Sequence, residues 1–89
     1  MQENLSLYHI FYTVSRTGNI STAAKELYIS QPAISRAIKK LESNLDTTLF
    51  ERSSRGVTLT PDGQILYEKA KGAFDLLSEG EDSILDNRS

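Results

Sequence analysis

Three short amphipathic segments follow one another in the first part of the chain, and each begins or ends at a residue that suits a helix terminus. Apolar side chains recur at helical spacing over residues 5–16, and Gly18 can adopt the left-handed conformation that ends many helices. Ser21 is placed to cap a second helix over residues 22–28, and Ser30 is placed to cap a third. Such short helices bury their apolar faces by packing against one another, so the segments predict one small helical core.

The third helix is expected over about residues 31–44, with Pro32 in its first turn, where the missing N–H of proline costs nothing. Its apolar side chains share one stripe, which we expect to be buried: Ile34, Ala37, Ile38, Leu41 and Leu45. The remaining helix surface carries Gln31, Pro32, Ser35, Arg36, Lys39, Lys40 and Ser43. One face of this helix is therefore polar and basic and is available to another molecule.

Two short strands are expected over residues 49–52 and 57–60, because serine, arginine and glycine at 53–56 supply a turn between them. Thr60 and Pro61 then mark a helix start, since threonine caps helices and proline suits the first helical position. The order of three helices and a hairpin is that of a winged helix-turn-helix. The predicted fold class is therefore mainly α: three helices and a two-stranded wing, followed by a long linker helix.

The linker helix is expected to run from residue 61 to about residue 85. Small and apolar side chains recur on it at alternating intervals of four and three residues, at Leu66, Ala70, Ala73, Leu77, Gly80 and Ile84. Tyr67, Phe74 and Leu76 flank this seam and make the apolar side broader than one isolated helix can hide, so we expect the first two turns of the helix to pack on the domain and the rest on a second subunit. The residues expected to dimerise are Leu66, Ala70, Ala73, Phe74, Leu77 and Ile84.

Composition argues against several functional classes. The 89 residues include no cysteine and one histidine, which excludes a thiolate metal site and a multi-histidine metal cage. The apolar runs are two or three residues long, so we expect no membrane span, no signal peptide and a cytoplasmic location. Glu42, Asp46 and Glu51 show no pairing suited to acid–base work, and no glycine-rich phosphate loop is present. We therefore expect no enzymatic activity, no metal and no cofactor.

The formal net charge of −2 hides an uneven distribution. Residues 1–60 carry seven basic and five acidic residues, a net charge of +2, whereas residues 61–89 carry three basic and seven acidic residues, a net charge of −4. Because DNA attracts basic surfaces, only the first sixty residues are expected to contact it. The same two segments are the expected units: a winged helix-turn-helix domain over 1–60 and a dimerising linker helix over 61–89.

A recognition helix enters the major groove with its N-terminal turns, so the residues expected to meet base edges are Gln31, Pro32, Ser35 and Arg36. Glutamine can pair with adenine, arginine can pair with guanine, and proline can pack on the thymine methyl group. Lys39 and Lys40 lie a turn further on, where we expect them to neutralise phosphates. Thr22 and Lys25 are expected to contact phosphate from the start of the second helix, because a helix N-terminus favours anions.

The wing at about residues 52–57 carries Arg55 at its tip and Arg52 on the strand before it. A narrow minor groove has a strong negative potential that attracts arginine, so Arg55 is expected to contact DNA there. Two alternatives stay open for Arg52. Its guanidinium can bind a phosphate, or it can pair with Glu51 or Glu42.

Two groups of motifs are specific enough to indicate a family. The first group is Ser21-Thr22-Ala23-Ala24, Leu27, Ser30-Gln31-Pro32-Ala33-Ile34-Ser35-Arg36, Ile38 and Leu41-Glu42. The second group is Leu45, Leu49-Phe50-Glu51-Arg52, Arg55-Gly56-Val57 and Leu59-Thr60-Pro61-Asp62-Gly63. With these motifs the chain resembles the LysR-type transcriptional regulators of bacteria over about residues 5–70, without gaps.

This resemblance implies a dimeric DNA-binding domain that binds an interrupted palindrome upstream of a promoter. It places the family's base and phosphate contacts on Gln31, Pro32, Ser35, Arg36, Arg52 and Arg55. It also implies an effector-sensing domain, absent from this chain, and makes a higher oligomer and RNA polymerase further candidate partners of the full-length protein. Two positions depart from the family: Asp46 stands where glycine is common, and Ala37 replaces a longer polar residue. Aspartate tolerates the left-handed conformation, so we expect the turn at Asp46 to survive.

A second class of function stays open from the sequence. A winged helix can serve protein assembly through its long helix, because a fold does not dictate a function. A chain of that class would dimerise and ignore DNA at low ionic strength.

Overall fold

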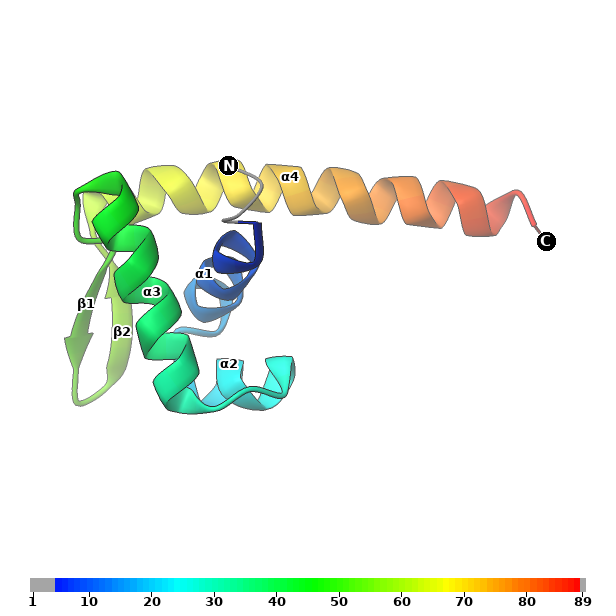
Figure 1. The fold of residues 1–89 in the computed structure, drawn as a ribbon. Coiled ribbons are helices and arrows are strands. Elements are labelled where there is room, and N and C mark those ends of the chain that lie inside the picture. Colours follow the sequence, from blue (N-terminus) through cyan, green and yellow to red (C-terminus); the bar gives the residue numbers. More distant parts are fainter. Residues whose placement is uncertain (1–4, 89) are drawn as a thin grey trace.

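Within residues 5–88, which the computed structural model describes, four helices and one antiparallel hairpin follow in the predicted order (Figure 1). The elements are α1 (Leu5–Thr17), α2 (Ile20–Leu27), α3 (Gln31–Leu45), β1 (Phe50–Ser53), β2 (Gly56–Leu59) and α4 (Pro61–Asp86). The first three helices and the hairpin form the domain, and α4 crosses it and extends beyond α1 (Figure 1). The predicted winged helix-turn-helix with a long last helix is confirmed.

The start of α2 differs from the prediction. Asn19, not Ser21, caps this helix: its backbone is extended, and its side-chain oxygen accepts a hydrogen bond from the Thr22 backbone N–H at 2.9 Å. Gly18 has a φ of +69° and turns the chain directly after α1. The helix therefore begins at Ile20, whose side chain packs against the core, and Ser21 falls inside the first turn.

The other two predicted caps are confirmed. The Ser30 side chain accepts a hydrogen bond from the Ala33 N–H at 3.2 Å at the start of α3, which has proline in its first turn. Thr60 accepts from the Gly63 N–H at 3.0 Å at the start of α4. At the end of α3, Asp46 adopts the left-handed conformation with a φ of +52°, as expected for the residue that replaces glycine.

The core lies where α1, α2 and α3 meet and is closed on one side by the hairpin. Its buried apolar side chains are Phe11, Val14, Ala23, Ala24, Ile34, Ile38, Leu41, Leu49 and Phe50. The rings of Phe11 and Phe50 lie 5.3 Å apart, so α1 and β1 are in direct contact. The predicted stripe on α3 is thus largely correct. Ala37 is only half-buried, and Leu45 is 43% exposed, because it is the last residue of α3 and lies beyond the core.

Each strand of the hairpin differs by one residue from its predicted bounds: β1 begins and ends one residue later, and β2 begins and ends one residue earlier. Its register pairs Phe50 with Leu59 and Ser53 with Gly56, which leaves a two-residue turn at the tip. Gly56 has a φ of +122°, and a Cβ on it would collide with the carbonyl oxygen of Gly18. Glycine is therefore required there, and the close approach fixes the hairpin against the turn between α1 and α2.

Helix α4 packs on α1 through aromatic side chains. The ring of Tyr12 lies 5.8 Å from that of Tyr67 and 4.9 Å from that of Phe74, and His9 lies 5.4 Å from Phe74. The expectation that only the first two turns of α4 contact the domain is therefore wrong. The contact continues to Phe74, about four turns into the helix.

Gly63 offers a test of how tightly α4 is joined to the domain. A Cβ on this residue would overlap the carbonyl oxygen of Leu49, so Gly63→Ala is expected to lower the free energy of unfolding by about 1–3 kcal/mol. Gly72→Ala is the matched control: nothing lies within 4 Å of its Cβ position, and alanine is expected to raise stability by about 1 kcal/mol. Urea unfolding at fixed protein concentration measures both. Equal effects at the two positions would contradict the close packing.

Candidate nucleic-acid interface

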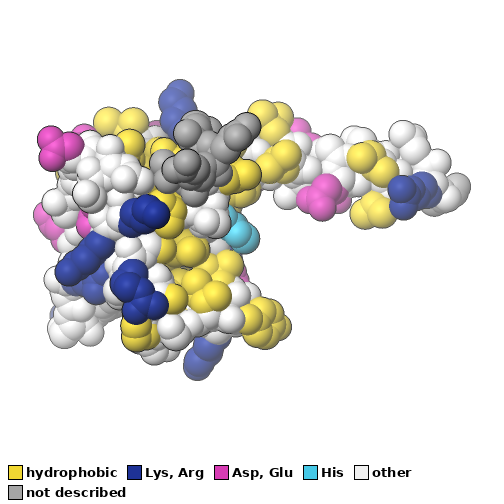
Figure 2. All heavy atoms as spheres, viewed as in Figure 1, with side chains coloured by type: hydrophobic (Ala, Val, Ile, Leu, Met, Phe, Trp, Pro, Cys, Tyr) yellow, Lys and Arg dark blue, Asp and Glu magenta, His cyan; other side chains and the backbone are white. Residues whose placement is uncertain are grey.

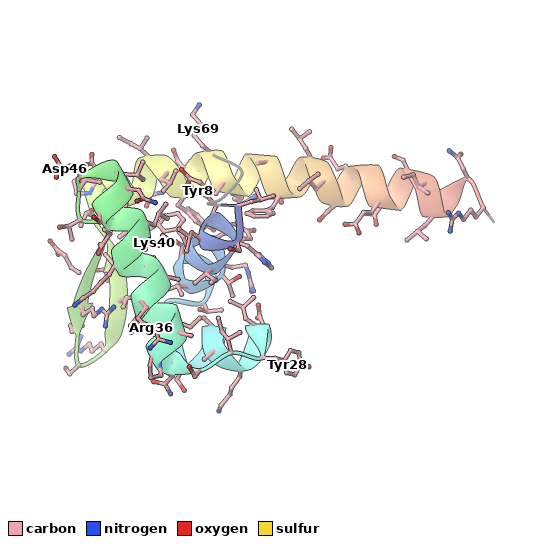
Figure 3. The ribbon with its side chains drawn as sticks, viewed as in Figure 1. Tyr8, Tyr28, Arg36, Lys40, Asp46 and Lys69 are labelled. Carbon is pink, nitrogen blue, oxygen red and sulfur yellow. The ribbon has the colours of Figure 1, made fainter. Side chains whose placement is uncertain are left out.

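The polar face predicted for α3 is on the surface. Gln31, Pro32, Arg36, Lys39 and Lys40 are exposed, and Ser35 is half-buried. Figure 3 shows Arg36 and Lys40 projecting from the same side of α3, with Arg36 nearer its N-terminal end. In Figure 2, Lys and Arg side chains gather over this part of the molecule. The structure thus brings the predicted residues of this helix onto one basic surface.

A hollow of about 330 Å³ separates the N-terminal ends of α2 and α3 from the wing. Its polar lining residues are Asn19, Ser21, Gln31, Arg52, Ser53, Ser54 and Arg55. Arg55 comes from the tip of the hairpin, and Gln31 is the first residue of α3. Predicted base-contact and wing residues therefore line one open cavity, whose walls supply hydroxyl, amide and guanidinium groups. Such groups are the donors that bind phosphate oxygens and base edges.

Arg52 makes a contact that was not among the predicted alternatives. Its Nη1 donates a hydrogen bond to the Ser35 hydroxyl at 3.5 Å, so it reaches from the wing to α3. Within residues 5–88 no ion pair joins Arg52 to Glu42 or Glu51, whereas its contact with a phosphate stays a prediction. The Glu42 carboxylate has other partners. Glu42 Oε2 accepts from the backbone N–H of Leu49 at 2.7 Å and of Phe50 at 3.4 Å. That Glu42 accepts hydrogen bonds from the backbone of the first strand was not predicted from the sequence.

The Glu42 contacts position the wing. They join the carboxylate of the third helix to the backbone at the start of β1, and a carboxylate that accepts two N–H groups is a strong anchor. The far end of the hairpin has an anchor of its own. There the Val57 N–H donates to the Gly18 carbonyl at 3.2 Å. The wing is therefore held to the helices at both ends.

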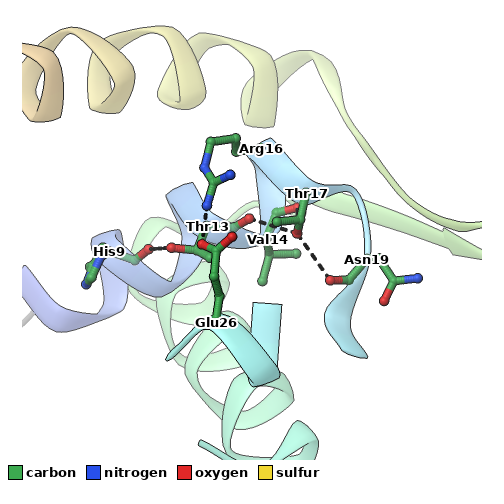
Figure 4. A network of polar contacts seen from close by, with 7 residues as sticks. All are labelled: His9, Thr13, Val14, Arg16, Thr17, Asn19 and Glu26. Carbon is green, nitrogen blue, oxygen red and sulfur yellow. Dashed lines mark hydrogen bonds and ion pairs between the residues drawn. The ribbon is translucent and has the colours of Figure 1, made fainter. Parts of the chain in front are cut away.

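A network of polar contacts links α1 to the first turn of α2 (Figure 4). The Thr17 hydroxyl donates to the Thr13 carbonyl at 2.9 Å and approaches the Asn19 carbonyl at 3.2 Å. Arg16 pairs with Glu26 across the two helices. Because Glu26 is paired with Arg16, Lys25 is the charge on α2 that has no ion pair within residues 5–88. Thr22, predicted to contact phosphate, is exposed next to the cap of the same helix.

A second surface feature is apolar and lies away from the wing. A groove of about 320 Å³ between α1 and α4 is lined by Leu5, Tyr8, Leu66, Ala73, Phe74 and Leu77, among others. Of the residues predicted to dimerise, Leu66 and Phe74 are half-buried, Ala70 is buried, and Ala73, Leu77 and Ile84 are exposed. The sequence did not single out Ile65 and Leu85, which are also exposed on α4.

Residues 5–88 contain no group of three or more metal-ligating side chains that could hold a metal ion. None of the helices in this part of the chain combines the length and the apolar character that crossing a membrane requires.

Comparison with known sequences identifies relatives with this arrangement. The family described as "Bacterial regulatory helix-turn-helix protein, lysR family" matches residues 5–64. The HTH-type transcriptional regulator PerR of Escherichia coli is 47% identical over 76 residues, which are 85% of this chain and 26% of PerR. GltR of Bacillus subtilis is 42% identical over 76 residues, again 26% of its length. The chain thus spans about a quarter of the length of these relatives.

Two solved structures of protein–DNA complexes resemble the chain closely. The CbnR DBD in complex with DNA is 34% identical, with a TM-score of 0.76, over 94% of this chain and 97% of that one. The BenM DBD in complex with catB site 1 DNA is also 34% identical, with a TM-score of 0.75, over 94% of this chain and 91% of that one.

The anchor at Glu42 leads to a stability prediction. Glu42→Ala leaves two N–H groups at the start of β1 without their charged acceptor, and is expected to lower the free energy of unfolding by about 1.5–3 kcal/mol. Glu51→Ala removes the same charge from an exposed strand position and is expected to change stability by less than about 0.5 kcal/mol. Thermal or urea unfolding compares the two. If both variants unfold like the parent, the Glu42 carboxylate does not anchor the wing.

Proposed function

We propose that this chain, which belongs to the lysR family of bacterial regulatory helix-turn-helix proteins, is the sequence-specific DNA-binding region of a transcriptional regulator. The observation that carries the proposal is the shared hollow, in which the first residue of α3 and two arginines of the wing face the same space. A duplex can meet both elements at once only if they open onto one surface. The similarity to the two DNA-bound structures supports the same conclusion.

In this proposal the first two turns of α3 lie in the major groove. Gln31 pairs with adenine, Arg36 pairs with guanine, and Pro32 packs on a thymine methyl group, because these side chains match the edges of those bases. All three are exposed, so contact with DNA requires no rearrangement of the core. Ser35 contacts a base or a phosphate, and its hydrogen bond with Arg52 links this helix to the wing.

The remaining contacts are with the DNA backbone. Lys39 and Lys40, further along α3, neutralise phosphates, and Thr22 meets a phosphate at the start of α2. Arg55, at the tip of the wing, enters the minor groove. These contacts fix the position of the helix on the duplex, and the base contacts supply the sequence preference.

The chain acts as a dimer in this proposal, with residues 1–60 as the DNA-binding domain and 61–89 as the linker helix. The occupant of the apolar groove between α1 and α4 is the linker helix of a second copy. The heptad spacing on α4 supports this choice, and Leu77 is 63% exposed, so no element of residues 5–88 covers it. Two recognition helices related by a two-fold axis then bind the two halves of an interrupted palindrome.

The full-length protein is proposed to be a cytoplasmic regulator that carries an effector-sensing domain beyond this segment. A higher oligomer and contact with RNA polymerase belong to that larger protein. The relatives are named as transcriptional regulators, which favours a role without catalysis. A protein-assembly module is the competing candidate, favoured by the exposed apolar side chains of α4.

Selection of bound sequences from a random DNA pool tests the proposal directly. Enrichment of a two-fold symmetric site is the expected result, because each subunit reads one half-site. If the chain dimerises but enriches no sequence and binds no duplex at low ionic strength, the assembly module replaces the proposed function.

Substitutions on α3 separate base contacts from phosphate contacts. Arg36→Ala is expected to cost about 1–3 kcal/mol on the selected site and to relax the preference at one position. Lys39→Ala is the matched loss of charge: it is expected to weaken selected and unrelated duplexes equally, and to lower the salt slope by about 1. Titrations over a range of salt concentrations measure both effects. A uniform loss for Arg36→Ala would reassign that residue to phosphate.

Leu77→Glu tests the dimer. A carboxylate in the apolar groove loses its hydration without gaining a partner, so self-association is expected to weaken by about a hundredfold. DNA affinity is expected to fall by about 10²-fold or more, because the second domain no longer binds as part of one assembly. Ser78→Glu adds the same charge one residue further along α4, outside the groove, and is the control. Analytical sedimentation measures the self-association of both variants. If Leu77→Glu dimerises like the parent, the dimer interface does not include this groove.

A further inference from the structure

The connection between α2 and α3 contains a tyrosine in an unfavourable backbone conformation. Tyr28 has φ and ψ angles of 58° and 39°, in the left-handed region. Its N–H approaches the Lys25 carbonyl at 3.4 Å, and the Ile29 N–H donates to the Ala24 carbonyl at 3.1 Å, so this residue closes the end of α2. Glycine or asparagine usually occupies such a position, because a Cβ disfavours this conformation. A bulky aromatic residue there needs a separate explanation.

The folded chain itself gives no reason for a tyrosine at this position. The Tyr28 side chain is 94% exposed, and within residues 5–88 it makes no recorded ring contact or side-chain hydrogen bond. The other non-glycine residue at positive φ is Asp46, whose short polar side chain tolerates that conformation. The strain at Tyr28 and the exposure of its ring are therefore uncompensated within the monomer, and such combinations are concentrated at binding surfaces.

The position of Tyr28 suggests what it binds. Three peptide units separate it from Gln31, the first residue of α3, so the two Cα atoms lie at most about 11 Å apart. Figure 3 shows Tyr28 projecting outward beyond the C-terminal end of α2, on the side of the molecule opposite to Arg36. The major groove is about 12 Å wide, so the phosphate backbone at its edge is within reach of a residue this close to a helix end that is seated in the groove.

The charges around Tyr28 also suit a phosphate. Lys25 was predicted at the start of the second helix, but it lies in the last turn of α2, where it is exposed one helical turn before Tyr28. Glu26, the nearest acidic residue in the sequence, is paired with Arg16. A neutral hydroxyl donor at this helix end adds a hydrogen bond to phosphate without introducing a repelling charge.

We propose that the Tyr28 hydroxyl donates a hydrogen bond to a phosphate oxygen of the DNA strand that borders the major groove. The inference rests on the proposed DNA-binding function and adds one contact to it. The left-handed backbone directs the ring outward from the end of α2, and the contact carries no base information. Tyr28 therefore adds affinity on any duplex and leaves the sequence preference unchanged.

Tyr28→Phe removes the hydroxyl alone. With the full chain and a site selected from the random pool, DNA affinity is expected to fall about tenfold, which is typical for a lost hydrogen bond to a charged group. The loss should be equal on an unrelated duplex, and the salt slope should not change, because tyrosine releases no counterion. Tyr12→Phe makes the same chemical change on α1, where the ring packs on α4, and serves as the control with unchanged DNA affinity.

Tyr28→Gly separates binding from stability. Glycine relieves the strain, so the melting temperature is expected to rise by about 3 °C, while DNA affinity falls at least as far as for Tyr28→Phe. If Tyr28 served stability alone, Tyr28→Gly would lower the melting temperature.

Ethylation interference locates the contact. One phosphate per half-site is expected to become insensitive to ethylation when Tyr28→Phe replaces the parent chain. Parent-like affinity and an unchanged interference pattern for Tyr28→Phe would overturn the proposal. In that case the parent still binds DNA and the proposed function stands, whereas a parent chain that binds no duplex would remove both.

Discussion

The rotation of α3 about its own axis decides which side chains this chain can offer to DNA, and apolar burial fixes that rotation. Ile34, Ile38 and Leu41 are almost completely buried, and burial of each such side chain contributes about 1.5–3 kcal/mol. Turning the helix far enough to hide Arg36 would expose this stripe and lose several kilocalories per mole. The outward direction of the polar face is thus a consequence of the core, and the wing is then positioned relative to that face by Glu42 and by the contact between Gly56 and Gly18.

The features predicted correctly from the sequence are those that local chemistry determines. Ser30 and Thr60 cap their helices because each hydroxyl stands directly before a first turn that contains proline. In that position it accepts a hydrogen bond from a free backbone N–H of the same turn. Asn19 and Ser21 can both cap a helix. Asn19 is the cap because Ile20 packs against the core as part of the helix, and that packing depends on the tertiary structure, which the local sequence does not show. The role of Glu42 escaped prediction for the same reason, because its partners are backbone groups seven and eight residues away.

For the linker helix, the sequence could not predict which element its apolar side packs against. This side is broad, and its heptad spacing predicts a packing partner without identifying it. In the structure this side is divided: Tyr67 and Phe74 pack on α1, while Leu76 and Ile84 are exposed. The division follows from where α1 ends beneath α4, and a periodic pattern contains no such information. One part of the apolar side is therefore used within the chain, and another part stays exposed.

The net charge of −2 is compatible with DNA binding because charge acts locally at a binding surface. Seven of the acidic residues belong to residues 61–89, and α4 extends away from the wing (Figure 1). Within the domain, Glu26 is paired with Arg16, and the Glu42 carboxylate faces backbone N–H groups. Glu51 remains exposed on β1, but adjacent strand residues point to opposite faces, so it lies on the other side of the strand from Arg52. A phosphate approaching the hollow between α3 and the wing therefore meets arginine and hydroxyl groups, and none of the carboxylates of residues 5–88 lines that hollow.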